Sequence, residues 1–197
     1  MRFKLFGTEF YISFLFSLII TVMIAFDKTG YAIPLLLSVL AHEGGHLAAM
    51  WISDCAPRRV RLVPAAVEIT VPVGTPYKRD LAVTLCGPAV NILLFVTMWL
   101  NFMFYKNSLT LVYAAVNLAV GLFNLLPVSG LDGGNVLYII ISRKHGAEKA
   151  CLTLKILTLT VAAILVTAGV FLIVKGNFNP SFFITALYLT VMSIAKS

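Results

Sequence analysis

The sequence predicts an all-α integral membrane protein with about six transmembrane helices. Of its 197 residues, 60% are hydrophobic and only 12% are charged, and the mean hydropathy is +0.96. Soluble domains have about 45–50% apolar and about 25% charged residues. A bundle of this size leaves no room for a soluble regulatory domain beside it, so we expect a single membrane domain over residues 1–197.

The apolar residues gather in long runs, each near the roughly 20 residues that a helix needs to cross a bilayer. The first run is followed by charged Asp27 and Lys28 rather than by a small-residue cleavage site, so we expect a retained helix and not a cleaved signal peptide. The sixth run is the shortest. The expected spans are residues 10–26, 31–52, 81–105, 109–126, 152–174 and 180–195.

The basic residues predict the orientation of these spans. With the amino end in the cytosol, only Lys28, Lys106 and Lys175 of the 15 lysines and arginines fall on the outer side. Both termini should therefore be cytosolic. This distribution also accounts for the net charge of +7. No basic stripe with interleaved aromatic residues is present, so nucleic acid is not expected as a partner.

Two connections between the runs are unusual. Residues 57–76 alternate apolar and polar side chains and then meet prolines, which predicts a short membrane-associated β-hairpin; a plain interfacial loop is the alternative. Residues 127–134, PVSGLDGG, follow the fourth run and cannot continue a regular helix. Irregular backbone at membrane depth is tolerated only where it lines protein or a cavity.

Two histidines and a glutamate lie inside the second run, in the stretch AHEGGHLAAM that begins at Ala41. His42 and His46 are four residues apart, so both imidazoles project from one face of a helix and can share one zinc ion. In this HExxH spacing Glu43 is placed as the base that takes a proton from water. At about 1.5 Å per residue, His42 lies roughly 15 Å inside the end of the span at Ile52. Ionisable groups at such depth usually have a functional task.

Asp132 is the candidate for a third ligand, because catalytic zinc usually has three protein ligands and one open position. It is the only acidic residue between positions 80 and 148, and it lies in the glycine-flanked break after the fourth run. A zinc site of His42, His46 and Asp132, with Glu43 as its base, accounts for all four polar residues at once.

The same residues allow other interpretations. His42, Glu43 and His46 could form a hydrogen-bonded cluster that only joins helices. A membrane metal or proton transporter would usually carry ionisable residues along a path through several spans, and the outer halves of these runs have almost none. A non-catalytic membrane binding protein would keep the fold and lose Glu43 or a ligand.

These motifs resemble those of the site-2 protease family of intramembrane zinc metalloproteases. HEGGH matches the family's HExxH, LDGG at residues 131–134 matches its Asp-Gly motif, and CGPAVN at residues 86–91 is similar to its Gly-Pro-x-x-Asn element. The resemblance covers most of the chain. It implies a three-helix catalytic core over about residues 31–135, zinc as cofactor, and a membrane-spanning or membrane-tethered protein as substrate. It also implies that Asn124 and Pro127 help to position the substrate, although both equally suit a helix end.

Within the family, the six-span layout resembles the branch that processes membrane-associated sigma factors during bacterial sporulation. It therefore implies a bacterial cytoplasmic membrane and a sigma factor precursor or anti-sigma factor as substrate, with membrane inhibitor proteins as further partners. That branch usually carries a carboxy-terminal nucleotide-binding domain, which is not found in this sequence, and the PDZ insertion of another branch is also missing. The sequence therefore does not support regulation by ATP or recognition of peptide termini.

Overall fold

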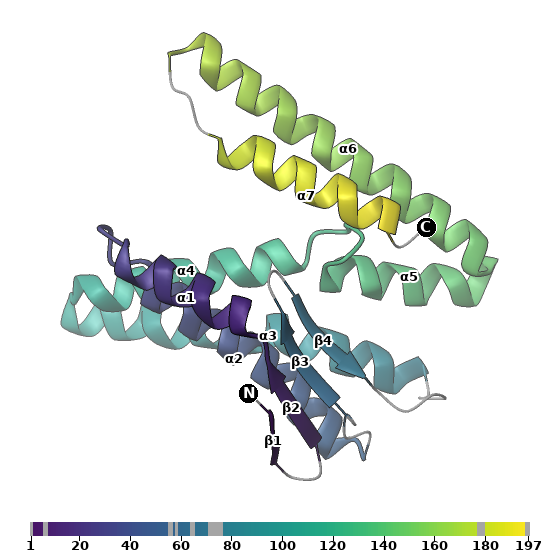
Figure 1. The fold of residues 1–197 in the computed structure, drawn as a ribbon, viewed down its shortest axis with the longest axis horizontal. Helices are drawn as coiled ribbons and strands as arrows, with labels where there is room; N and C mark the ends of the chain where they lie inside the picture. Colours follow the sequence, from purple (N-terminus) through teal and green to yellow (C-terminus); the bar gives the residue numbers. More distant parts are fainter. Residues whose placement is uncertain are drawn as a thin grey trace. The chain divides into compact units, whose positions relative to one another are not determined.

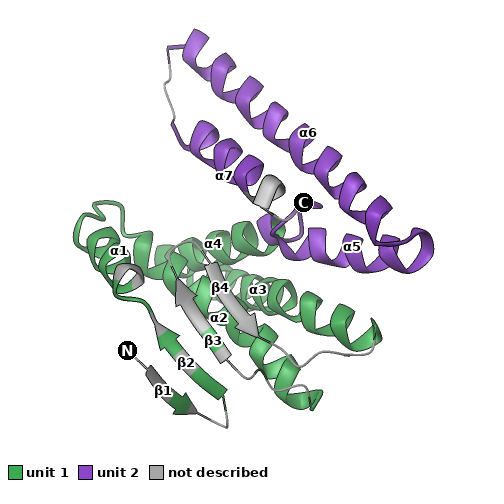
Figure 2. Ribbon diagram, turned by 45° about the vertical axis from the view of Figure 1, so that its right-hand side comes forward, with its two compact units in different colours: residues 1–122 green, residues 123–197 purple. Residues whose placement is uncertain are grey.

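The computed structural model describes residues 2–5, 8–54, 57, 59–63, 66–70, 77–176 and 180–195, which are mostly helical (Figure 1). The chain divides into two compact units, residues 1–122 and residues 123–197 (Figure 2). The strands are β1 (Arg2–Leu5), β2 (Thr8–Ile12), β3 (Arg59–Val63) and β4 (Ala66–Thr70). The helices are α1 (Phe14–Ala25), α2 (Ala32–Ile52), α3 (Tyr77–Tyr105), α4 (Ser108–Asn124), α5 (Asp132–His145), α6 (Ala147–Val174) and α7 (Ser181–Ala195).

The first unit contains a four-stranded sheet in the order β1-β2-β3-β4. β1 pairs antiparallel with β2, β2 pairs parallel with β3, and β3 pairs antiparallel with β4. A parallel pair needs a long crossover connection, and here α1 and α2 provide it between β2 and β3. Buried Thr8, the first residue of β2, binds the chain just before β3, since its hydroxyl donates to the carbonyl of Pro57 at 2.8 Å.

The two short strands that the sequence suggests between residues 57 and 76 lie within this larger sheet, with β4 at one edge. Residues 58, 64–65 and 71–76 lie outside the described part of the chain. The membrane-associated β-hairpin stays a prediction.

The first expected span differs from the observed structure. Residues 10–12 belong to β2, because their backbone pairs with that of β3, and the helix begins only at Phe14. α1 has 12 residues, which is about 18 Å at 1.5 Å per residue and short of the roughly 30 Å hydrocarbon core. The first three residues of the expected span are therefore part of a strand, and the helix is correspondingly shorter.

The amino end of α2 is held by a carboxylate from the preceding loop. Asp27 accepts hydrogen bonds from the backbone N–H of Ala32 at 2.8 Å and from both the N–H and the hydroxyl of Thr29. The first N–H groups of a helix have no partner within the helix, so Asp27 satisfies one of them. The Thr29 hydroxyl, followed by the backbone donors, lowers the pKa of Asp27 to about 2.

Small residues bring α2, α3 and α4 close together. A Cβ added at Gly45 of α2 would lie 2.8 Å from the Cys86 carbonyl oxygen of α3. A Cβ added at Gly121 of α4 would lie 3.1 Å from the Asn91 Cβ of α3. Glycine lets helix backbones approach in this way because no side chain separates them.

The second unit holds α5, α6 and α7, with α6 and α7 side by side (Figure 1). Its core is formed by Val128 and Leu131 from the loop before α5 together with Leu189 from α7. The same loop is tied to α6, because the Ser129 N–H donates to the buried Thr158 hydroxyl at 2.9 Å. The loop that precedes Asp132 is therefore fixed by packing and by a hydrogen bond.

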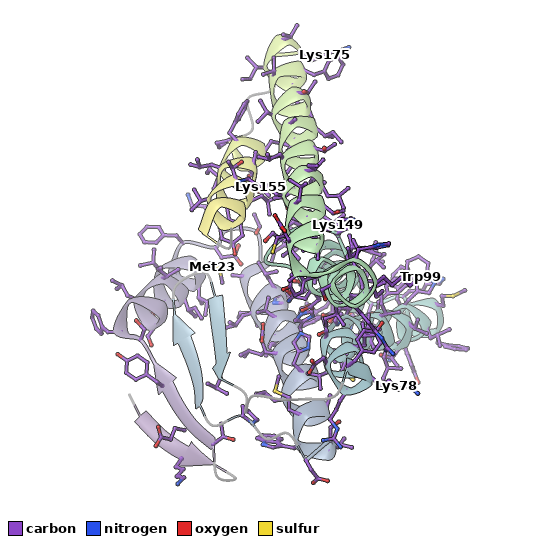
Figure 3. All side chains as sticks on the ribbon, turned by 90° about the vertical axis from the view of Figure 1, so that its right-hand side faces the viewer. Met23, Lys78, Trp99, Lys149, Lys155 and Lys175 are labelled. Atoms are coloured by element: carbon purple, nitrogen blue, oxygen red, sulfur yellow. The ribbon has the colours of Figure 1, made fainter. Side chains whose placement is uncertain are left out.

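Three of the described helices, α2, α3 and α6, are long and apolar enough to cross a membrane. Large apolar side chains stay exposed near the ends of two of them, as at Phe104 and Val174, each 81% exposed, which suits contact with lipid. Figure 3 shows Lys175 at the end of α6 far from Lys149, so charged groups flank the apolar length of the helix. α4 and the described part of α7 are shorter apolar helices, and the count of six spans stays a prediction.

Candidate metal centre

The two histidines of HEGGH lie side by side on α2, as their spacing predicts. Both are buried, with His42 4% and His46 8% exposed. Their Nε2 atoms are 3.2 Å apart, and their ring planes meet at 87°. One turn of helix thus directs two imidazole nitrogens at the same small space.

The other ring nitrogens are occupied by α3. His46 Nδ1 lies 2.9 Å from the backbone carbonyl oxygen of Val83, which can only accept, so Nδ1 carries the hydrogen and Nε2 keeps a lone pair. His42 Nδ1 lies 2.7 Å from Asn91 Oδ1. Metal-binding histidines almost always donate their second ring nitrogen in this way, which fixes ring orientation and tautomer.

Gly87 keeps the space beside the two Nε2 atoms clear. A Cβ added at this position of α3 would collide with His46 Nε2 and lie 2.9 Å from His42 Nε2. Any side chain other than hydrogen would therefore occupy the volume to which both nitrogens point.

The nitrogen pair fits a zinc ion. Two Zn–N bonds of about 2.0–2.1 Å at the tetrahedral angle separate their nitrogens by about 3.3–3.4 Å, close to the 3.2 Å between the Nε2 atoms. Imidazole also suits zinc chemically. Without a cation or a proton between them, two lone pairs would face each other at this distance. The spacing of the two nitrogens is therefore compatible with two ligands of one metal ion.

Of the remaining predicted site residues, Glu43 shares α2 with the histidines and the other three lie later in the chain. Glu43 is half-buried on α2, directly after the first histidine. Asp132 is the half-buried first residue of α5 in the second unit, Asn124 is the last residue of α4, and exposed Pro127 lies in the loop between them. The structure brings His42 and His46 together within the first unit; the roles of Glu43, Asp132, Asn124 and Pro127 stay predictions.

Gly133 and Gly134 of the LDGG motif are required by close packing of the backbone. A Cβ at Gly133 would collide with the Leu125 and Leu126 carbonyl oxygens, and one at Gly134 would collide with the carbonyl of Val128. The first turn of α5 therefore lies directly against the loop that leads into it. Only glycine at both positions lets the chain place Asp132 at the start of a helix so soon after this loop.

Sequence reasoning assigned no role to three buried polar residues beside the histidines: Ser38, Asn91 and Asn117. Asn91 ends the CGPAVN element that carries part of the family resemblance, and Asn117 is a lone amide in an otherwise apolar stretch. Polar side chains in apolar helices usually bond across to a neighbouring helix. That signal was present in the sequence, but their partners are visible only in the structure.

Comparison with known proteins agrees with this centre. Residues 106–168 match the family described as Peptidase family M50. Stage IV sporulation protein FB of Bacillus subtilis (strain 168) is 33% identical over 121 residues, which are 59% of this chain and 42% of that protein. A zinc metalloprotease of Methanocaldococcus jannaschii is 26% identical over 160 residues, which are 75% of this chain and 47% of that protein. The chain thus spans less than half the length of these relatives.

The fold is shared with a solved structure. The site-2 protease from Methanocaldococcus jannaschii superposes with a TM-score of 0.73 at 22% identity, covering 99% of this chain and 94% of that one. Several apolar helices accompany this fold, as in an integral membrane protein. The matched family model, the relatives named zinc metalloproteases and the common fold agree with one another, and all three are similarities to peptidase family M50 and its site-2 proteases.

Proposed function

We propose that this chain is an intramembrane zinc metalloprotease, which hydrolyses peptide bonds of membrane-spanning or membrane-tethered proteins. One observation supports this most directly: two buried Nε2 atoms lie 3.2 Å apart on α2, a helix long and apolar enough to cross a membrane. Glu43, the base that the HExxH spacing predicts, adjoins them in the sequence.

In this proposal His42, His46 and Asp132 hold the metal. They offer two imidazole nitrogens and one carboxylate oxygen, a donor set that catalytic zinc uses while keeping a fourth position open. Asp132 stands at the amino end of α5, where a carboxylate is also favoured by the helix dipole. The loop packing that fixes the start of α5 would hold this ligand still.

Bound zinc would supply a Lewis acid for the scissile carbonyl and would lower the pKa of water towards neutrality. Glu43 takes a proton from the attacking water, whose oxygen adds to the carbonyl carbon. When the C–N bond breaks, Glu43 returns that proton to the leaving amine nitrogen. Asn124 and Pro127, at the end of α4 and in the loop after it, would position the extended substrate.

The finer assignments follow from the resemblance and from the charges. We propose a multi-pass protein of six spans in a bacterial cytoplasmic membrane, with both termini in the cytosol. Similarity to a stage IV sporulation protein favours a sigma factor precursor or an anti-sigma factor as substrate. Membrane inhibitor proteins are the further partners proposed.

Paired variants separate the base from the ligands. Glu43→Gln should keep zinc and the shape of the side chain while removing the base, so it should bind but not cut. Asp132→Asn should lose both zinc and cleavage, because an amide is a poorer zinc ligand than a carboxylate. Zinc content is measured by metal analysis of detergent-purified protein, and cleavage with a membrane-tethered substrate.

The metal itself is tested in the same preparations. Wild type should hold about one zinc per chain, and His42→Ala or His46→Ala should hold far less. Exposed His145, at the end of α5, provides the matched control, and His145→Ala should keep zinc and cleavage. Absence of zinc from wild type, or wild-type cleavage by Glu43→Gln, would refute the proposed chemistry.

A further inference from the structure

A buried hydrogen-bond network joins α2, α3 and α4 directly behind His42. Its members are Ser38, Asn91 and Asn117, which are 2%, 0% and 3% exposed. The Asn91 Nδ2 group, with its two hydrogens, lies within hydrogen-bond distance of three acceptors: the Ser38 carbonyl at 3.1 Å, the Ser38 hydroxyl at 3.0 Å and Asn117 Oδ1 at 3.0 Å. The Ser38 hydroxyl donates to Asn117 Oδ1 at 3.1 Å. Three helices thus meet at one amide.

The direction of each hydrogen bond is fixed by two backbone carbonyls, which can only accept. Asn117 Nδ2 donates to the Tyr113 carbonyl at 2.9 Å, so Asn117 must turn its oxygen towards α3. Asn91 then meets two acceptors, that oxygen and the Ser38 carbonyl, and must turn its NH₂ group towards them. The remaining atom of the Asn91 amide, Oδ1, is left facing His42 Nδ1 at 2.7 Å.

We propose that Asn91 is a positioning residue of the metal centre, which holds the hydrogen of neutral His42 on Nδ1 and so keeps the Nε2 lone pair directed at the metal. The inference rests on the proposed function, since it gives the Nε2 atom a metal to bind. Ser38 and Asn117 act one step further away, because they prevent the Asn91 amide from rotating by 180°.

The physical basis is the cost of the reversed arrangement. If the Asn91 amide rotated, its oxygen would face two other oxygens and its NH₂ group would face His42. Buried polar groups that lose their partners are costly, and the low local dielectric of apolar helices raises that cost. His42 would then need an unprotonated Nδ1 and would carry its hydrogen on Nε2, where it blocks metal binding. The network therefore selects the tautomer that can bind zinc.

The first test compares Asn91→Leu with a control on the same helix, Asn101→Leu, whose side chain is exposed. The tautomer of His42 is measured in zinc-free, ¹⁵N-histidine-labelled protein in detergent micelles, and the zinc dissociation constant by chelator competition. Wild type and Asn101→Leu should show His42 hydrogen on Nδ1. Asn91→Leu should show a mixture of tautomers and bind zinc about 10–100-fold more weakly, as is typical when an outer hydrogen-bond partner is removed.

A conservative variant separates this role from simple joining of helices. Asn91→Asp keeps an acceptor for His42 Nδ1, although its second carboxylate oxygen can no longer donate to the Ser38 carbonyl or to Asn117 Oδ1 and accepts from the Ser38 hydroxyl instead. It should therefore keep the hydrogen of His42 on Nδ1 and bind zinc more tightly than Asn91→Leu. If Asn91→Leu does not fold, the tautomer of His42 in Asn91→Asp decides the question by itself.

Two results would overturn the proposal. One is an unchanged tautomer and unchanged zinc affinity in folded Asn91→Leu, which would leave the network as a connection between helices only. The other is zinc binding by Asn91→Asp no better than by Asn91→Leu, or a changed tautomer in Asn91→Asp. Failure of the proposed protease is distinguishable, because it would appear as absence of zinc from wild type, whereas the tautomer is read in zinc-free protein.

Discussion

Replacing Gly87 with alanine should empty the metal centre without removing a ligand. The added Cβ would collide with His46 Nε2, lie 2.6 Å from His46 Cε1 and lie 2.9 Å from His42 Nε2. Non-bonded heavy atoms prefer about 3.5–4.0 Å, so α3 must move away from the His42 ring by about 0.6 Å or more and from the His46 ring by about 0.9 Å or more. Metal–ligand distances hold to within about 0.2 Å. The displaced nitrogens would therefore no longer reach one ion.

The expected loss follows from that displacement. Misplacing a catalytic group by about 1 Å costs on the order of 100-fold in rate, and we expect zinc affinity to fall at least as far. A factor of about 100 corresponds to about 2.8 kcal/mol of binding free energy. The assay is chelator competition with detergent-purified protein, together with the zinc content per chain. Helix content, measured by circular dichroism, should stay close to wild type.

Gly44→Ala is the matched control, since this glycine lies inside HEGGH itself. A Cβ at Gly44 has none of the described atoms within 4 Å, and the residue is exposed. The substitution should keep wild-type zinc affinity and favour the helix by up to about 1 kcal/mol. If Gly87→Ala binds zinc as tightly as Gly44→Ala, the two Nε2 atoms do not share the space beside α3, and the geometry argued for the centre is wrong.

Three further outcomes are expected. The pKa of Asp27, about 2 in the folded protein, should rise towards 3.8 in Thr29→Val, as measured by ¹³C NMR. Because the folded pKa is lowered, the stabilisation that Asp27 gives to Ala32 at the start of α2 is present above pH 3.8 and is lost as the pH falls through about 2. Thr158→Val should destabilise the loop before α5 by about 1–3 kcal/mol through the lost hydrogen bond, which thermal unfolding and limited proteolysis would detect; unchanged values would refute the anchor. Reporters fused at Ser197 and inserted between α5 and α6 should both report the cytosol, and opposite locations would contradict the pairing of the last two spans.

The sequence was sufficient to predict that the two histidines lie together. An i, i+4 pair of histidines on a helix must share a face whatever the surrounding fold, and the structure confirms this for His42 and His46. The sequence also predicted an integral membrane protein, because several apolar runs of about 20 residues with few charges are typical of transmembrane helices. The motif resemblance to the site-2 proteases agrees with the match of residues 106–168 to peptidase family M50 and with the shared fold.

Tertiary structure decided what depends on partners far apart in the chain. Residues 10–12 form the start of an apolar run, yet they pair with residues 60–62 of β3, far along the chain. Nothing in a local pattern records such a partner, since backbone pairing depends on where another strand lies. The same holds for Asn91, whose amide orientation is fixed by carbonyls on α2 and α4. Local spacing determines which groups a helix face presents, whereas contacts between helices decide which atom of each group faces the metal.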